Sequence, residues 1–287
     1  MESKKRLRSG EEEENVRGGK RPRGEDRPEA PLGLPEELWS RVVGLLDKAD
    51  RKPFSCTCRC FELLAKTSPT LNSESCDIAA VNGRLWMLQM LREMGCPWNE
   101  KTCAAAAEGG HLEVLQWARE HGCPWNEKVC TKAAKCGHLV LLMWAREHGC
   151  PWNVLTSAAA AERGDLIMLK WLKENGCPWD PLTCVAAAER GDLTMLKWLK
   201  ENGCPWDART CTVAAMGGHL DVLKWAREEE CPWNQRTSIY AACNGHLELL
   251  QWAWGNGCPW NRWVREYAVM EDHTDVVNWI DEVFSRT

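Results

Sequence analysis

Small and apolar side chains recur along most of the chain in a pattern that repeats every 27 residues. Within residues 180–206, small side chains from Cys184 to Ala188 predict a short first helix. Leucines at every third position from Leu193 to Leu199 predict a second helix with one apolar face. Each interval is therefore expected to fold as a helix–turn–helix unit with a short link to the next.

Polar and conformationally special residues mark the ends of both predicted helices. Asp180 can cap the first helix, with Pro181 at its first position, and Asp192 can cap the second. Gly203 is expected to end the second helix in the left-handed conformation, and Pro205 prevents its continuation. Local chemistry therefore predicts the same helix boundaries as the apolar pattern.

The unit recurs without insertion or deletion. A loop of the form Gly-Cys-Pro-Trp, with Glu230 in place of the glycine in one copy, ends each unit except the last, and its cysteines are Cys96, Cys123, Cys150, Cys177, Cys204, Cys231 and Cys258. Counted from the Asn or Asp that follows each loop, residues 72–287 form eight units. A fixed period of this length predicts a solenoid, in which each unit buries its apolar face only against its neighbours.

Two positions of the unit carry tryptophan in nearly every copy. One lies in the loop and the other on the apolar face of the second helix, and together they hold fourteen of the eighteen tryptophans. A row of aromatic rings could stack nucleic-acid bases. Its place on the apolar helix face favours packing instead. Charged residues of the second helices, such as Arg119 and Lys173, are expected to form a solvated outer face.

The run from Gly110-His111-Leu112-Glu113-Val114 to Gly122-Cys123-Pro124-Trp125-Asn126, with paired alanines at Ala106 and Ala107, resembles an ankyrin repeat. Ankyrin units are about 33 residues long. The residues missing here fall where that family has its β-hairpin fingers. The resemblance covers residues 72–287 and implies an all-α, ankyrin-like solenoid with shortened hairpins, whose first helices line a concave, partner-binding side.

Residues 1–31 consist of charge, Gly and Pro without an apolar pattern, so we expect a disordered tail. Two basic clusters within residues 4–23 look like a bipartite nuclear import signal, although a solvated tail of mixed charge explains them equally well. Residues 32–71 change character: Pro35 opens a predicted helix, and Asp50 can cap a second one. A module of this size needs a partner or the neighbouring repeats to form a stable core.

The run Leu34-Pro35-x-x-Leu38, the pair Val42-Val43, Asp50, and Cys58-Arg59 leading to Ala65 together resemble an F-box. F-boxes dock on the Skp-type adaptor of cullin-based ubiquitin ligases. The resemblance implies an adaptor-binding surface formed by Leu34, Pro35, Leu38, Val42 and Leu46. Arg51-Lys52-Pro53 departs from the aliphatic residues usual in that family, and a generic helical cap on the solenoid is the alternative.

The formal net charge of the chain is −5, and residues 32–287 alone carry −6. This acidic balance argues against a nucleic-acid partner. No apolar run approaches the length of a membrane-spanning helix and no secretory signal opens the chain, so we expect no membrane association. Seventeen cysteines without an export signal indicate reduced thiols in the cytoplasm or the nucleus.

Recurring cysteines and histidines make a zinc array the tempting alternative to packing. Twelve of the seventeen cysteines occupy two positions of the unit, but equivalent cysteines of stacked units are too far apart for one tetrahedral ion. The denser run Cys56-x-Cys58-x-Cys60 is spread around a helix axis. No catalytic triad, phosphate loop or pair of carboxylates appears. We therefore expect no metal, no cofactor and no enzymatic activity.

These features predict a non-catalytic substrate receptor of a Skp/cullin/F-box ubiquitin ligase, with a scaffold or inhibitor as the alternative. Target binding is expected on the first helices, at positions that vary between units: Glu108, Lys135, Glu162, Glu189, Val213, Met216 and Tyr240. Variation is also usual on any solvated face. The sharper hypothesis rests on Val213, Met216 and Tyr240, which are apolar or aromatic at positions expected to be exposed.

Overall fold

The computed structural model describes residues 73–285, which lie in one compact unit of the chain that begins at Thr70. This described part contains sixteen helices and no strand. The predicted tail, the F-box-like module with its adaptor-binding residues, and the boundaries after residues 31 and 71 fall outside the described residues. They remain predictions from the sequence.

The helices alternate in pairs, one pair for each 27-residue unit. The first helices are α3 (Ser73–Val81), α5 (Glu100–Gly109), α7 (Lys128–Cys136), α9 (Val154–Arg163), α11 (Pro181–Glu189), α13 (Ala208–Met216), α15 (Gln235–Cys243) and α17 (Trp263–Met270). The second helices are α4 (Leu85–Glu93), α6 (Leu112–Glu120), α8 (Leu139–Glu147), α10 (Leu166–Glu174), α12 (Leu193–Glu201), α14 (Leu220–Glu228), α16 (Leu247–Gly255) and α18 (Thr274–Ser285). The predicted all-α repeat of paired helices is confirmed.

The helix ends follow the predicted local chemistry. The carboxylate of Asp180 accepts a hydrogen bond from the amide of Leu182 at 3.0 Å, and Asp192 caps α12 in the same way. At the other end of α12, Gly203 adopts a left-handed φ of 78°. The amide of Cys204 then donates to the carbonyl of Leu199 at 2.9 Å, which completes a Schellman-type termination.

Two left-handed positions are occupied by residues with a side chain. The residue before the loop Cys231-Pro232-Trp233 is Glu230, where the other copies have glycine, and its φ is 60°. Asp272 takes the place of the glycine between the two helices of the last unit, with a φ of 58°. The repeat geometry therefore imposes the left-handed conformation even where no glycine is present.

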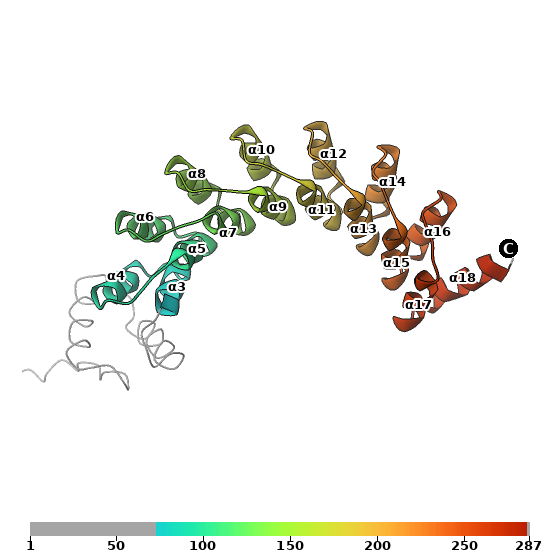
Figure 1. The fold of residues 1–287 in the computed structure, drawn as a ribbon, viewed down its shortest axis with the longest axis horizontal. Helices are drawn as coiled ribbons and strands as arrows, with labels where there is room; N and C mark the ends of the chain where they lie inside the picture. Colours follow the sequence, from blue (N-terminus) through green and yellow to red (C-terminus); the bar gives the residue numbers. More distant parts are fainter. Residues whose placement is uncertain (1–72, 286–287) are drawn as a thin grey trace, which may run out of the picture. The chain divides into compact units, whose positions relative to one another are not determined.

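The core lies between the two helix layers. Leucines of the second helices, such as Leu196 and Leu223, are fully buried against small residues of the first helices, such as Ala187 and Cys184. Because these residues are small, neighbouring first helices pack closely, whereas neighbouring second helices approach each other much less. Figure 1 shows the consequence: the first helices line the inner side of the curved row of repeats.

The loop tryptophans tie each unit to the next. Trp179 meets Trp198 of the following unit edge-to-face, with ring centroids 6.0 Å apart, and equivalent pairs recur along the described repeats. On the other face of Trp179 lies the ammonium of Lys173, 4.0 Å from the ring centroid. Arg119 covers Trp125 in the same way, at 4.2 Å. Lys173 is exposed, as predicted for the outer face, and Arg119 is half-buried, and the cations of both also stack on aromatic rings.

Candidate protein-binding surface

The exposed side of the first helices forms a continuous surface, which we call the first-helix face. In α11 its three positions are held by Leu182, Ala186 and Glu189, of which Ala186 is buried and Glu189 is exposed, and each other unit contributes the three equivalent positions. Its residues change from unit to unit, whereas the buried positions beside them stay Cys, Ser or Ala in most units. Substitutions on this face can therefore change which partner is bound without altering the core.

Charged pairs occupy the N-terminal half of the first-helix face. The ammonium of Lys132 lies 2.9 Å from the carboxylate of Glu108, and that of Lys135 lies 3.2 Å from Glu162. Both pairs bridge neighbouring first helices and are about half exposed, so each contributes at most about 1 kcal/mol to stability. Three predicted binding residues, Glu108, Lys135 and Glu162, thus already have partners. Glu189 is exposed and has no ion pair among the described residues.

Apolar and aromatic residues occupy the C-terminal half of the same face. Val213 and Met216 on α13 are half-buried rather than exposed as expected, while Tyr240 on α15 is 37 % exposed. The Lys132–Glu108 pair shows that the middle position of one unit approaches the last position of the preceding unit. By that equivalence, Tyr240 and Met216 occupy neighbouring positions on adjacent first helices.

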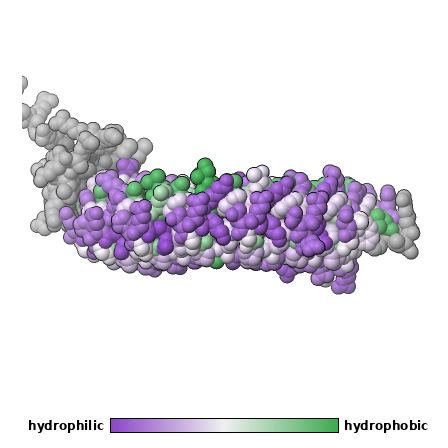
Figure 2. Space-filling model, turned by 90° about the horizontal axis from the view of Figure 1, so that it is seen from above, coloured by the Kyte–Doolittle hydropathy of each residue, from purple (hydrophilic) through white to green (hydrophobic). Residues whose placement is uncertain are grey.

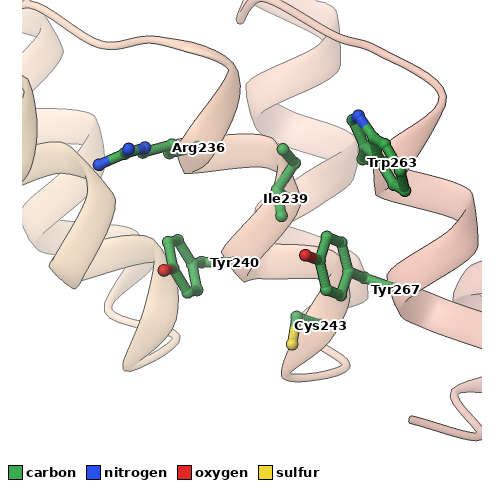
Figure 3. A pocket seen from close by; sticks show the side chains of 6 residues that line it. All are labelled: Arg236, Ile239, Tyr240, Cys243, Trp263 and Tyr267. Atoms are coloured by element: carbon green, nitrogen blue, oxygen red, sulfur yellow. The ribbon is translucent and has the colours of Figure 1, made fainter. Parts of the chain in front are cut away.

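Next to Tyr240 the structure places a pocket of about 270 Å³ between α15 and α17. It is lined by Arg236, Ile239, Tyr240, Cys243, Trp263 and Tyr267. In Figure 3 the rings of Tyr240 and Tyr267 stand side by side on the two helices, with the thiol of Cys243 between and below them. Arg236 and Trp263 lie on the side of the pocket where both helices begin.

The charges around this pocket are asymmetric. Arg236 is exposed and has no ion pair among the described residues, whereas Arg209 of the preceding unit lies 2.8 Å from Asp207. The hydrogen bond from Arg209 lowers the pKa of Asp207. At the opposite end, burial raises the pKa of the Cys243 thiol, and the nearby negative charge of Glu271 raises it further. The pocket therefore has a free cation at one end and a carboxylate near the other.

Sequence reasoning found Tyr240 but missed Tyr267 and Trp263. Tyr267 occupies the unit position of Tyr240, whereas Trp263 occupies that of Arg236, which is not among the predicted binding residues. Comparing the same unit positions in the last unit as well would have shown these two aromatic residues in the sequence. What the sequence lacks is the packing of α15 against α17, which turns two separate tyrosines into two walls of one pocket.

Cysteines do not form a metal centre in the part of the chain that the structure describes, where no group of three potential ligands occurs. They pair within units: Ser157 replaces one member of such a pair and donates a hydrogen bond to Cys177 at 3.3 Å. The neighbouring thiol of Cys123, followed by burial, raises the pKa of Cys103 far above its usual range. These cysteines are therefore buried as neutral thiols, the form suited to packing rather than to ligating or attacking.

The second-helix side offers less apolar surface. Figure 2 views this side and shows a mostly hydrophilic face with small apolar patches. Its exposed large apolar residues include Val140 on α8 and Ile167 on α10. Among the described residues, no helix has the length and apolar character required to cross a membrane.

Comparison with known proteins bears on the same helices. Comparison with curated proteins gives no match. A family model described as ankyrin repeats in many copies matches residues 184–227, which run from α11 to the end of α14. The chain is therefore similar to ankyrin repeats at the centre of its row of helix pairs. This match and the 27-residue period of paired helices agree on an ankyrin-like repeat architecture, which implies interaction with protein partners.

Proposed function

We propose that the protein is a non-catalytic substrate receptor of a Skp/cullin/F-box ubiquitin ligase. The F-box-like residues Leu34, Pro35, Leu38, Val42 and Leu46 bind the adaptor, and the first-helix face binds the target. The protein then supplies no catalytic residue. It raises the concentration of the target near the ubiquitin-transferring enzyme, as linked binding sites do.

The observation that carries target binding is the aromatic end of the first-helix face. Tyrosine and tryptophan dominate the energetics of protein interfaces when they surround a desolvated centre. Tyr240, Tyr267 and Trp263 gather there on two adjacent helices, all three exposed by more than a third. No other part of the first-helix face in the described residues has three exposed aromatic side chains.

The target-binding role predicts that Tyr240→Ala combined with Met216→Ala weakens target binding by about 2 kcal/mol or more, as hot-spot truncations do. The target can be identified by proximity labelling with residues 32–71 deleted, so that it is not degraded, and its affinity measured by calorimetry. The unfolding free energy should change by less than about 1 kcal/mol, as at other surface sites. Ile167→Ala on the second-helix side serves as the control and should bind normally. Loss of binding in that control would mean that the target binds the second-helix side instead of the first-helix face.

The ligase role predicts that Leu34→Ala with Pro35→Ala abolishes co-purification of the Skp-type adaptor and the cullin. Circular dichroism should show that the helical signal of the repeats is retained. Adaptor binding that survives both substitutions argues against the F-box assignment.

A scaffold or inhibitor that binds the same target without ubiquitin chemistry is the second candidate. The departure at Arg51-Lys52-Pro53 favours it, because aliphatic residues are usual at that place in F-boxes. The two candidates differ in one measurement. A receptor lowers the target's abundance unless the proteasome is inhibited, whereas a scaffold leaves it unchanged.

A further inference from the structure

We propose that the pocket between α15 and α17 receives one large apolar side chain of an unfolded target segment, and that Arg236 binds a carboxylate on the same segment. This inference rests on the proposed target-binding role of the first-helix face and specifies the chemistry of what binds there. The segment is extended and carries an acidic residue on the Arg236 side of its anchoring side chain. On the Glu271 side it is neutral or basic.

The size of the pocket selects a side chain rather than a small-molecule ligand. Sites for small molecules usually measure about 300–1,000 Å³ and enclose most of the ligand. The pocket here measures about 270 Å³ and lies on an exposed helix face. Its walls are the rings of Tyr240 and Tyr267, with Ile239 and Trp263 above them in the view of Figure 3. One aromatic or large aliphatic side chain fits such a space, and an intact helix does not.

The charges around the pocket determine the flanking residues of the segment. Arg236 is the only exposed cation that lines it, and it forms no ion pair within the described residues. A guanidinium in this state can bind a carboxylate through two parallel hydrogen bonds. Near the other end, the Glu271 carboxylate acts on Cys243 and repels acidic residues. Charge complementarity therefore gives the bound segment a direction along the helices.

The chemistry at the base of the pocket is non-covalent. Burial is the main cause that raises the pKa of the Cys243 thiol, and Glu271 adds to it. The sulfur therefore stays protonated near neutral pH and contributes a small apolar contact. Beyond the pocket, Val269 and Met270 on α17 are 47 % and 71 % exposed, because no further unit covers this helix among the described residues. They extend the apolar surface at the end of α17, the Glu271 side of the pocket, where a segment that runs along the helices leaves it.

The test uses the full-length chain and a phage-displayed library of random twelve-residue peptides, which contains no assumption about the target. We expect selection to enrich peptides with Phe, Trp, Leu or Ile that have Asp or Glu within about three residues, the reach of an extended chain across one helix. The best peptide, synthesised with a fluorophore, is then titrated by anisotropy. Its Asp→Asn or Glu→Gln analogue is titrated in parallel.

Three variants separate the parts of the proposal. Tyr240→Ala should weaken the peptide at least tenfold, because one wall of the pocket is removed. Arg236→Gln should bind the acidic peptide and its amide analogue equally, whereas the wild type should prefer the acidic one at least fivefold. Arg209→Gln is the matched control, since Asp207 already neutralises that guanidinium, and it should keep the preference. Circular dichroism and thermal unfolding should show all three variants folded.

The outcomes distinguish this inference from the proposed function. An unenriched library, or a best peptide that Tyr240→Ala binds as tightly as the wild type, overturns the pocket inference. The ligase role stands or falls separately with adaptor co-purification. A preference for acidic peptides that persists in Arg236→Gln overturns the assigned role of Arg236. A best peptide whose binding is lost in Ile167→Ala but kept in Tyr240→Ala overturns both the pocket and the target-binding role of the first-helix face.

Discussion

Because the repeat length is fixed, single residues at the helix ends must adopt a left-handed backbone conformation. With no spare residue in the 27, the chain must reverse at one position before each loop, and this position has a positive φ. Glycine adopts that conformation freely, whereas a residue with a Cβ is strained there. Glu230 is such a residue, with a φ of 60°, and no ion pair with it occurs among the described residues.

Glu230→Gly is therefore expected to stabilise the protein by about 1 kcal/mol through relief of backbone strain. The free energy of unfolding in urea measures the effect. Gly203→Ala is the matched control at the equivalent position one unit earlier along the chain, where an added Cβ meets no atom within 4 Å. Its expected loss of about 1 kcal/mol comes from conformation alone. If Glu230→Gly lowers the free energy of unfolding instead, the Glu230 side chain makes a stabilising contact that outweighs the strain.

At the scale of elements, a few side chains couple neighbouring units, and two different solutions occur. In most units a histidine before the second helix reaches back, as His219 does when its Nε2–H donates to the carbonyl of Glu189 at 2.9 Å. In the units of α10 and α12 the same place before the helix holds Asp165 and Asp192, which cap the helix instead. Arg190 then makes the backward bond, to the carbonyl of Glu162 at 3.1 Å. The coupling bond is thus made by Arg190 in place of the histidine, and Asp192 adds a side-chain cap that the histidine units lack.

The stacked cations of the second helices provide a second coupling that can be tested. Lys200 lies 4.1 Å from the centroid of Trp206, whose ring meets Trp225 of the next unit. Lys200→Glu should destabilise the protein by about 0.5–1 kcal/mol, the worth of a partly exposed cation–π contact. Lys200→Arg should be close to neutral, because Arg119 and Arg227 occupy the equivalent place in other units. Chemical denaturation of both variants checks this, and equal losses would mean that the cation itself is unimportant.

At the scale of the whole repeat unit, stability depends on neighbours. Each internal first helix packs between two others, whereas α17 packs only on α15 among the described first helices. In a linear array the stability is approximately a sum of unit and interface terms, so units with one interface open most easily. The pocket proposed to bind the target thus lies at the interface with the least supported unit.

Hydrogen exchange should reflect this gradient. We expect amides of α17 and α18 to exchange at least tenfold faster than those of α11 and α12, because α17 packs on only one first helix, α15, among the described residues. Mass spectrometry of the full-length protein resolves the two regions. Binding of the selected peptide should slow exchange in α15 and α17 more than in α11. Uniform exchange along the repeats would contradict the linear-array description.

The sequence by itself determined the repeat. Caps at Asp180 and Asp192 and left-handed ends such as Gly203 are local features, and the apolar spacing of the leucines gives each helix its buried face. Such features act within a few residues, so they can be read without knowing the partners of a helix. The all-α repeat, its period and the burial of Cys184 in the core therefore followed directly.

Only the tertiary structure decided which residues meet across units. It showed that Lys173 stacks on Trp179, and that Lys135 is paired with Glu162. It also placed Tyr267 beside Tyr240, although 27 residues separate them in the chain. These contacts depend on the distance and angle between stacked helices, which arise from the packing of small residues between them. A periodic sequence states which positions are equivalent, and the stacking geometry determines which of these positions touch.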